Sequence, residues 1–496
     1  MASRQCPLAA AGAAGQPASG YANARDELER RRTRTDELYV SGTADLLIER
    51  CRASGLVERF GSPLFVVSET TLRQNYRRFR SAFGSQWPGT VRVFYAIKSN
   101  NNLAVRAILS DEGAAGECFG AAELMATLAG GTDPAQVAVN GSNKTAQDLA
   151  LAVEHGVVVN IDAEDECQRL AAAARAAGRR VRVNLRLKVA PPQLDELASD
   201  SYRLAPGELR QDVLREKWGF SAEAAQPLIR EILAAPELAL LGYHLHIPRA
   251  CQEPELHSSC GRVLVQAVAG LARQTGFVPS VLDVGGGWAR ERDPESRSLA
   301  ANPFTVEDYA AQMCQAMLDE LSAASLPVPE LWVEPGRYLV GNAAVLLATV
   351  GAVKRDAGHT WVNVDASTNL FARMDSRGCR HVVLPAAGMD RPFAEEVRVV
   401  GPVCVESLLA GGRQMPRLGR GEVVVVLDAG MYAESAASQF NGMPRPATVL
   451  VRGDRADVIR RRETFADVFR ANRIPDRLAR SAGPRHLLSQ LVPDGG

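Results

Sequence analysis

A lysine ends one of the most apolar stretches of the chain, VRVFYAIKSNNNL. Residues 91–97 are mostly apolar or β-prone, and Lys98 is followed by Ser99 and three asparagines. A strand at the centre of a parallel sheet is a near-continuous apolar run, and lysine is rarely buried without a partner. Lys98 is therefore either a residue where a strand reaches the surface or a buried amine kept as a nucleophile, for which a lowered pKa is expected.

Other expected strand ends also carry residues suited to chemistry. In chain order these are Glu117, Asn140, His244 with His246, Gly285–Gly286–Gly287, and Glu334 with Arg337. Three glycines directly after a strand offer backbone N–H groups to a phosphate, although a tight turn would use the same residues. Arg337 is placed to bind that phosphate, and Glu334 to pair with a cation such as a protonated ring nitrogen. The alternative for this pair is an internal salt bridge.

The two histidines of GYHLHI fall on one face of their strand. Two such residues can bind zinc, but the sequence offers no evident third ligand group, so we expect no metal. Stacking on an aromatic ring or hydrogen bonding within the core is favoured instead. Together, the strand-end residues describe a pocket for an aldehyde, a phosphate and a protonatable aromatic ring.

The elements that must position these residues alternate between strand and helix over residues 62–340. The expected strands include LFVVS, VFYAIKS, VVVNID, RVRVNLRLK, LGYHLHI, VLDVGGG and LWVEPG. Roughly eight such units predict a parallel sheet closed into a (β/α)8 barrel, with its active groups at the C-terminal strand ends. Residues 341–475 contain strands with little helix between them, which predicts a second, all-β domain.

The ends of the chain are expected to lie outside these domains. Residues 1–36 are interpreted as a disordered leader or frayed helix, 37–61 as a segment packing on the β domain, and 476–496 as a tail.

Composition excludes several function classes. The chain has 496 residues with 57 basic and 57 acidic side chains, so its charge indicates neither nucleic acid nor membrane as a partner. Nine scattered cysteines without a C-x-x-C pair argue against a disulfide framework and a zinc ribbon. They favour a reduced, cytoplasmic setting, and no segment has the length of a membrane span.

A series of segments follows the order typical of one enzyme family. These are FYAIKSN, GAAGECFGAAE, NGSNKT, EKWGF, GYHLHI, LDVGGGW, EPGRYLVG, GPVCVES, MYAESAASQFNGMPRP and IRRRET. Over about residues 60–470 the chain resembles the fold-type III decarboxylases of the diaminopimelate and ornithine decarboxylase type, and is nearer the former. The resemblance implies an alanine-racemase-like (β/α)8 barrel with a second β-sandwich or β-barrel domain. It also implies bound pyridoxal 5′-phosphate (PLP) and a homodimer whose active site is shared across the interface.

The resemblance assigns roles on the cofactor side. Lys98 would bind the cofactor covalently, His246 would stack on its ring, and Glu334 would keep its ring nitrogen protonated. The phosphate would be bound by Gly285, Gly286, Gly287, Arg337 and Tyr432.

The resemblance also assigns roles on the substrate side. Cys404 of the neighbouring subunit would be the general acid near Cα, with a buried structural thiol as the alternative. Arg373 would meet a substrate carboxylate, and Glu406, in the same run as Cys404, would also contact the substrate.

Departures from the family pattern bear on the substrate. Arg249 follows HLHIP where the family has Gly-Ser, Arg377 stands in place of a tyrosine, and Val405 and Leu408 replace acids. A pocket that loses acids and gains Arg249 and Arg377 favours an amino acid with a distal carboxylate or phosphate. Our leading expectation is decarboxylation of such an amino acid, free or carrier-bound, in specialised metabolism. The alternative is meso-diaminopimelate decarboxylation to L-lysine.

Two further functions compete with decarboxylation. Alanine-racemase-like activity is disfavoured because those enzymes pair the ring nitrogen with arginine, whereas this chain has Glu334. A catalytically inactive regulatory binding protein is disfavoured because Lys98, Glu334, Arg337 and Cys404 are all present.

Overall fold

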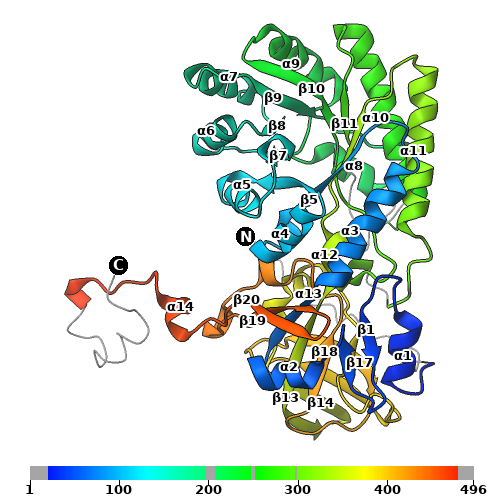
Figure 1. The fold of residues 1–496 in the computed structure, drawn as a ribbon, viewed down its shortest axis with the longest axis vertical. Coiled ribbons are helices and arrows are strands. Elements are labelled where there is room, and N and C mark those ends of the chain that lie inside the picture. The colour runs from blue at the N-terminus through cyan, green and yellow to red at the C-terminus, as the bar shows by residue number, and fades with distance from the viewer. Residues whose placement is uncertain (1–19, 197–206, 247–251, 297–298, 479–496) are drawn as a thin grey trace, which may run out of the picture.

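The computed structural model describes residues 20–196, 207–246, 252–296 and 299–478, without the side chains of residues 296, 375–377 and 476. Two bodies lie end to end along the long axis of the molecule, a helix-ringed barrel and a β-rich domain (Figure 1).

The barrel consists of eight parallel strands that close on themselves, β12 pairing with β5. Its strands are β5 (Val91–Ala96), β6 (Ala115–Phe119), β7 (Val137–Asn140), β8 (Val158–Ile161), β9 (Val181–Arg186), β10 (Leu238–His244), β11 (Val281–Asp283) and β12 (Glu330–Val333). Helices cover the outer face of the strands and the inner face is enclosed, which explains the continuous apolar runs. The predicted (β/α)8 barrel is confirmed.

Helices alternate with the barrel strands and form the outer ring of the barrel (Figure 1). They are α3 (Glu69–Gly84), α4 (Leu103–Asp111), α5 (Gly120–Ala129), α6 (Ala146–His155), α7 (Glu166–Ala176), α9 (Ala222–Ala234), α10 (Pro254–Thr275) and α11 (Val306–Ala323). A shorter helix, α8 (Glu208–Arg215), lies in the long connection between β9 and α9. None of the helices in the described ranges is long and apolar enough to cross a membrane.

The second domain is built on a nine-stranded sheet. Its strands are β4 (Leu64–Ser68), β13 (Ala344–Asp356), β14 (His359–Val364), β15 (Val383–Pro385), β16 (Glu395–Val400), β17 (Leu408–Met415), β18 (Val423–Val426), β19 (Ala447–Arg452) and β20 (Arg455–Arg460). The segment LFVVS, expected to open the barrel, is β4 and pairs with β13 and β19 instead. All five of its residues are buried, and an apolar run does not reveal which sheet buries it.

The N-terminal region differs from the expected leader. Residues 24–31 form α1 (Ala24–Arg31), capped by the Asn23 side chain, and Ala24 and Leu28 are buried in the core of the β domain. The expectation of a disordered leader is therefore wrong for residues 20–36, and the frayed helix named as its alternative is a capped, partly buried helix at residues 24–31. Next come β1 (Leu38–Val40), β2 (Leu46–Ile48), β3 (Cys51–Arg52) and α2 (Ala53–Phe60).

The last described helix, α14 (Phe465–Phe469), follows β20 and extends away from the β domain (Figure 1). The expected tail from residue 476 lies almost wholly outside the described residues.

Candidate active site

Lys98 lies in a short 3₁₀ turn, Ile97–Ser99, that directly follows β5. The turn is held from the other domain. The Ser435 hydroxyl donates to the carbonyl of Lys98 at 3.0 Å, and the Tyr432 N–H donates to the carbonyl of Ser99 at 2.7 Å. The β domain thus fixes the backbone of the residue whose side chain enters the barrel mouth.

The amine of Lys98 is paired with a carboxylate. Its Nζ lies 2.5 Å from Oε2 of Glu117 on β6. Burial alone would lower the pKa of Lys98, but the carboxylates of Glu117 and Glu334 outweigh it and raise that pKa. The lowered pKa expected from the sequence is therefore wrong, because an apolar run of residues does not show the carboxylates of neighbouring strands.

Glu334 follows β12 and is buried and ionised. Burial opposes ionisation, but His244 and Lys98 lower its pKa to about 2. Asn140 donates to its Oε1 at 3.0 Å, and Nε2 of His244 lies 3.4 Å from its Oε2. This carboxylate is suited to hold a cationic ring nitrogen.

Asp283 at the end of β11 lies beside Glu334 but has the opposite character. Burial, and then repulsion from Glu334, raise the pKa of Asp283 well above its ordinary value. Ligand atoms of His244, Asp283 and Glu334 all lie within 4.8 Å of one another. Two acids whose pKa values are shifted in opposite directions therefore lie close to the imidazole of His244.

The glycine run after β11 brings three strand ends close together. A Cβ on Gly285, whose φ is +67°, would lie 2.4 Å from the carbonyl oxygen of Leu245. A Cβ on Gly286 would lie 2.5 Å from the carbonyl oxygen of Glu334. Only glycine fits at these two positions, and the backbone is left open toward the barrel mouth.

His246 follows β10 and borders the same opening. The Gly286 N–H donates to its Nδ1 at 3.4 Å. Desolvation, followed by the charges of Arg186 and Lys98, lowers the pKa of His246. A neutral imidazole at this position can stack on an aromatic ring without adding charge.

The carboxylate of Glu295 contacts two arginines that line the cavity. Arg337, at the start of α12 (Arg337–Val340), pairs with Asp293 at 3.2 Å and with Glu295. Arg373, in α13 (Ala372–Arg377), pairs with the other oxygen of Glu295. The guanidinium carbon of Arg373 also lies 3.4 Å from the ring centre of Tyr432.

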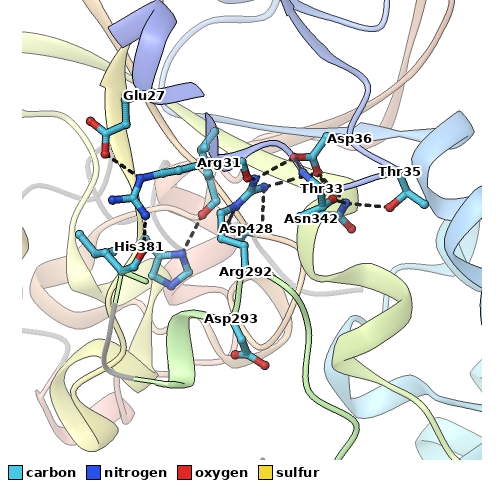
Figure 2. A network of polar contacts seen from close by, with 12 residues as sticks. Glu27, Arg31, Thr33, Thr35, Asp36, Arg292, Asp293, Asn342, His381 and Asp428 are labelled. Carbon is cyan, nitrogen blue, oxygen red and sulfur yellow. Dashed lines mark hydrogen bonds and ion pairs between the residues drawn. The ribbon is translucent and has the colours of Figure 1, made fainter. Parts of the chain in front are cut away.

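The loop that carries Asp293 and Glu295 is anchored by their neighbour Arg292 (Figure 2). Arg292 pairs with Asp428 of the β domain at 2.5 Å and with Asp36 of the N-terminal segment at 2.8 Å. Three separate parts of the chain thus meet at a buried guanidinium and fix this loop.

These groups surround a single cavity of about 370 Å³, within the range of small-molecule sites. The cofactor-side residues expected from the sequence that line it are Lys98, His246, Gly286, Gly287, Glu334 and Arg337. Arg373 and Tyr432 line it as well, whereas Gly285 lies behind the lining against the end of β10.

Other expected substrate residues lie elsewhere. Cys404 is exposed, its N–H bonded to Oδ1 of Asn441 at 3.1 Å, and the Glu406 side chain is 62% exposed, 3.6 Å from Arg398. Neither is among the described residues that line the cavity. Arg249 lies outside the described residues, as does the side chain of Arg377.

Sequence reasoning missed one wall of the cavity. Arg186 at the end of β9 lies with its guanidinium carbon 4.9 Å from the ring centre of Trp218. Val213 and Glu216 reach the cavity from α8 and the residue after it. The signal was the unusual length of the connection that contains α8.

Comparison with known proteins supports what this geometry suggests. A family model described as "Pyridoxal-dependent decarboxylase, pyridoxal binding domain" matches residues 69–341. The diaminopimelate decarboxylase of Methanothermobacter thermautotrophicus is 32% identical over 446 residues, 89% of this chain and 99% of the relative. The chain belongs to the pyridoxal-dependent decarboxylases. The diaminopimelate decarboxylase of Archaeoglobus fulgidus is 31% identical over 88% of this chain and 99% of its own length.

Solved members of this decarboxylase family share the fold. The crystal structure of diaminopimelate decarboxylase from M. jannaschii with L-lysine superposes with a TM-score of 0.82 at 24% identity, covering 90% of this chain and 99% of that one. The lysine/ornithine decarboxylase of Vibrio vulnificus with putrescine gives a TM-score of 0.64 at 21% identity, covering 80% and 97%.

The residues of the cavity fit the family's cofactor, PLP. Lys98 offers an amine to the aldehyde, and Glu334 an ionised carboxylate to the ring nitrogen. The two ring nitrogens of His244 and Oδ2 of Asp283 are buried without a hydrogen-bond partner among the described residues. His244 lines the cavity, which can therefore accept a polar ring. The protein is thus a PLP-dependent amino-acid decarboxylase.

Proposed function

We propose that this decarboxylase acts on meso-diaminopimelate, removing one α-carboxylate to give L-lysine. The observation that carries the proposal is the placement of Arg373. It lines the same cavity as Lys98, stacked on Tyr432 and held by Glu295. A guanidinium fixed on two sides is preorganised to bind a distal carboxylate. The curated relatives of similar length carry the name diaminopimelate decarboxylase.

Our leading expectation from the sequence, another anionic substrate in specialised metabolism, has less support. It depended on Arg249 and on Arg377, whose side chains lie outside the described residues. The charge that the structure places at Arg337 and Arg373 is matched by Asp293 and Glu295. Among the described residues, these two arginines therefore add little net positive charge to the cavity.

The residues of the chain have separate roles toward the cofactor in this proposal. Bound PLP supplies an electron sink for the pair that departing CO₂ leaves at Cα. Ionised Glu334 preserves the positive charge on the ring nitrogen that such a sink requires. Glu117 holds the Lys98 amine at 2.5 Å, ready to receive or give a proton when the substrate amine takes its place.

The proton returned to Cα is assigned to a second subunit. Cys404, Val405 and Glu406 are all exposed on one loop and lie away from the cavity of their own chain. We propose a homodimer in which this loop completes the partner's site, with Cys404 as the acid and Glu406 beside the substrate.

The substrate proposal is tested with a matched pair, because L-lysine is diaminopimelate without its distal carboxylate. The wild-type enzyme is expected to decarboxylate meso-diaminopimelate and to leave L-lysine unchanged. Replacing Arg373 by Gln should lower kcat/KM for diaminopimelate about tenfold to a hundredfold, the usual effect of losing a charged hydrogen bond. The control is Arg355→Gln, which removes an exposed pair with Glu395.

Two results would contradict the proposal. One is conversion of L-lysine to cadaverine as fast as diaminopimelate is used. The other is an Arg373→Gln enzyme that matches the Arg355→Gln control. Turnover confined to another amino acid with a distal anion would instead support our leading expectation from the sequence.

A further inference from the structure

Hydrogen bonds link three asparagine side chains inside the barrel, and this series ends on the carboxylates of Glu117 and Glu334. Asn184 donates to Oδ1 of Asn160 at 3.0 Å, and Asn160 donates to Oδ1 of Asn140 at 2.7 Å. The amide of Asn140 then donates to Oε1 of Glu117 at 2.9 Å and to Oε1 of Glu334 at 3.0 Å.

The three asparagines lie at one level of three successive strands. Asn160 on β8 and Asn184 on β9 are directly paired in the sheet register. Asn140 follows Val139, whose register partner on β8 is Val159, the residue before Asn160. All three are at most 2% exposed, so each amide depends on its neighbours for hydrogen bonds.

The chemistry of the side chains fixes which amide donates and which accepts in this series of hydrogen bonds. An ionised carboxylate only accepts hydrogen bonds, so Asn140 must turn its NH₂ group toward Glu117 and Glu334. Its oxygen then faces Asn160, which must donate, and the oxygen of Asn160 requires a donor from Asn184 in turn. Reversing any amide would place two oxygens face to face in a buried site.

We propose that Asn160 and Asn184 are positioning residues that lock Asn140 in the one orientation able to hold both carboxylates of the PLP site. Each acid accepts one hydrogen of the same NH₂ group, which joins two like charges in the buried interior of the barrel. The proposal holds for any amino-acid substrate, because it concerns the cofactor side of the site.

The charges around Glu117 show why Asn140 must keep this orientation. Burial raises the pKa of Glu117, and the charge of Glu334 raises it further, whereas Lys98 and the hydrogen bond from Asn140 lower it. Losing the Asn140 bond would favour protonation of an acid that must stay charged beside the Lys98 amine. Asn160 touches neither acid, so its effect must pass through Asn140.

The test uses the isosteric change Asn160→Asp in the full-length protein. Aspartate keeps the shape of the side chain but, when ionised, cannot donate to Asn140. We expect PLP to dissociate about tenfold more readily at pH 8, since a buried acceptor loses its donor. Affinity should recover at lower pH, because the new carboxyl group can donate again once it is protonated.

The matched control is Asn75→Asp. Asn75 is also a buried amide in a series of hydrogen bonds. It donates to Oδ1 of Asn342 at 2.8 Å and accepts from Thr35 at 2.6 Å. It should lower the melting temperature to a similar degree without a pH-dependent change in PLP affinity. Asn184→Asp, one step further from the acids, should show the same acid recovery with a smaller loss.

The readouts are the dissociation constant of PLP and the pH midpoint of the bound cofactor's absorbance, each measured beside the melting temperature of the PLP-free protein. The inference is overturned if Asn160→Asp and Asn75→Asp lose stability alike and bind PLP alike at every pH. Should Asn160→Asp fail to fold, Asn184→Asp decides by the same comparison.

Discussion

The Nζ atom of Lys98 lies 2.5 Å from Oε2 of Glu117, a side chain of the adjacent barrel strand. This pair sets the charge of the amine that we propose to react with the cofactor. Because Glu117 and Glu334 together raise the pKa of Lys98, the amine is a cation over most of the accessible pH range. A cationic amine must lose its proton before it can attack an aldehyde.

Replacing Glu117 by Gln is therefore expected to lower the pKa of Lys98. The rate at which the PLP-free protein captures PLP should reach its plateau at a pH lower by about one unit or more, the usual effect of removing a close opposite charge. Stopped-flow absorbance across a pH series measures this. Glu123→Gln serves as control, because the Glu123 carboxylate accepts from the Phe119 N–H at 2.7 Å. An unchanged plateau pH for Glu117→Gln would contradict the assigned role of the pair.

Glu295 is expected to control substrate recognition through Arg373. In Glu295→Gln the guanidinium of Arg373 keeps its stacking on Tyr432 but loses its ionic anchor. We expect kcat/KM for diaminopimelate to fall about tenfold or more, mostly through KM, since binding of the distal carboxylate weakens. Steady-state kinetics measure the split between kcat and KM.

The control for that prediction is a nearby acid of the same loop. Glu291 pairs with Arg78 on α3 rather than with the cavity arginines. Glu291→Gln should leave both kinetic constants close to those of the wild type. Equal effects from the two substitutions would mean that Glu295 does no more than hold the loop together.

Some of this site was readable from the sequence, because strand-end residues of a barrel converge whatever the loops do. Lys98, His246, Glu334 and the glycine run were found in this way. Glu295 was not found in this way, because it lies well after β11 in a loop whose path depends on Arg292. Asn160 and Asn184 did leave a signal, a polar residue within the apolar runs VVVNID and VRVNLR. In a strand buried on both faces such a residue needs a partner inside the barrel.

The fold, like the site, could be predicted only in part from the sequence. Alternating strands and helices predicted the barrel, but LFVVS has the composition of any buried strand, and its place in the β domain is set by β13 and β19. The helix at residues 24–31 was expected only as a frayed alternative to disorder, because its composition is polar and only Ala24, Glu27 and Leu28 are buried.

Arg292→Met tests the anchor of the loop. The substitution leaves Asp36 and Asp428 buried without their shared counter-charge. Breaking a buried pair of this kind costs about 3–5 kcal/mol in the free energy of unfolding. Urea denaturation measures the loss. A variant as stable as the wild type would show that the network in Figure 2 is held by its other hydrogen bonds.

The same network predicts an acid dependence of stability. Burial opposes ionisation of Asp36, but Arg292 and the Thr33 and Asn342 hydrogen bonds lower its pKa below the ordinary 3.8. A depressed pKa in the folded state stabilises the protein above pH 3.8, and this contribution is lost as the pH falls through and below that value. Asp36→Asn should reduce the slope of unfolding free energy against pH there. Exposed Asp454→Asn should leave it unchanged.

Mixing two inactive variants tests the shared site. A Lys98→Ala subunit lacks the amine proposed to bind the cofactor, and a Cys404→Ala subunit lacks the proposed acid. If the loop acts in the partner's cavity, half of the dimers in an equal mixture regain one intact site. About a quarter of the wild-type activity is then expected. A mixture as inactive as its components would contradict a site shared between subunits.

The most direct test of the proposed function is product analysis with PLP-loaded protein and meso-diaminopimelate. CO₂ release and L-lysine formation are followed together, with Lys98→Ala as the blank. We expect equal amounts of CO₂ and L-lysine from the wild type and neither from the blank. A protein that holds PLP and releases no CO₂ from meso-diaminopimelate, yet does so from another amino acid, would contradict the assignment.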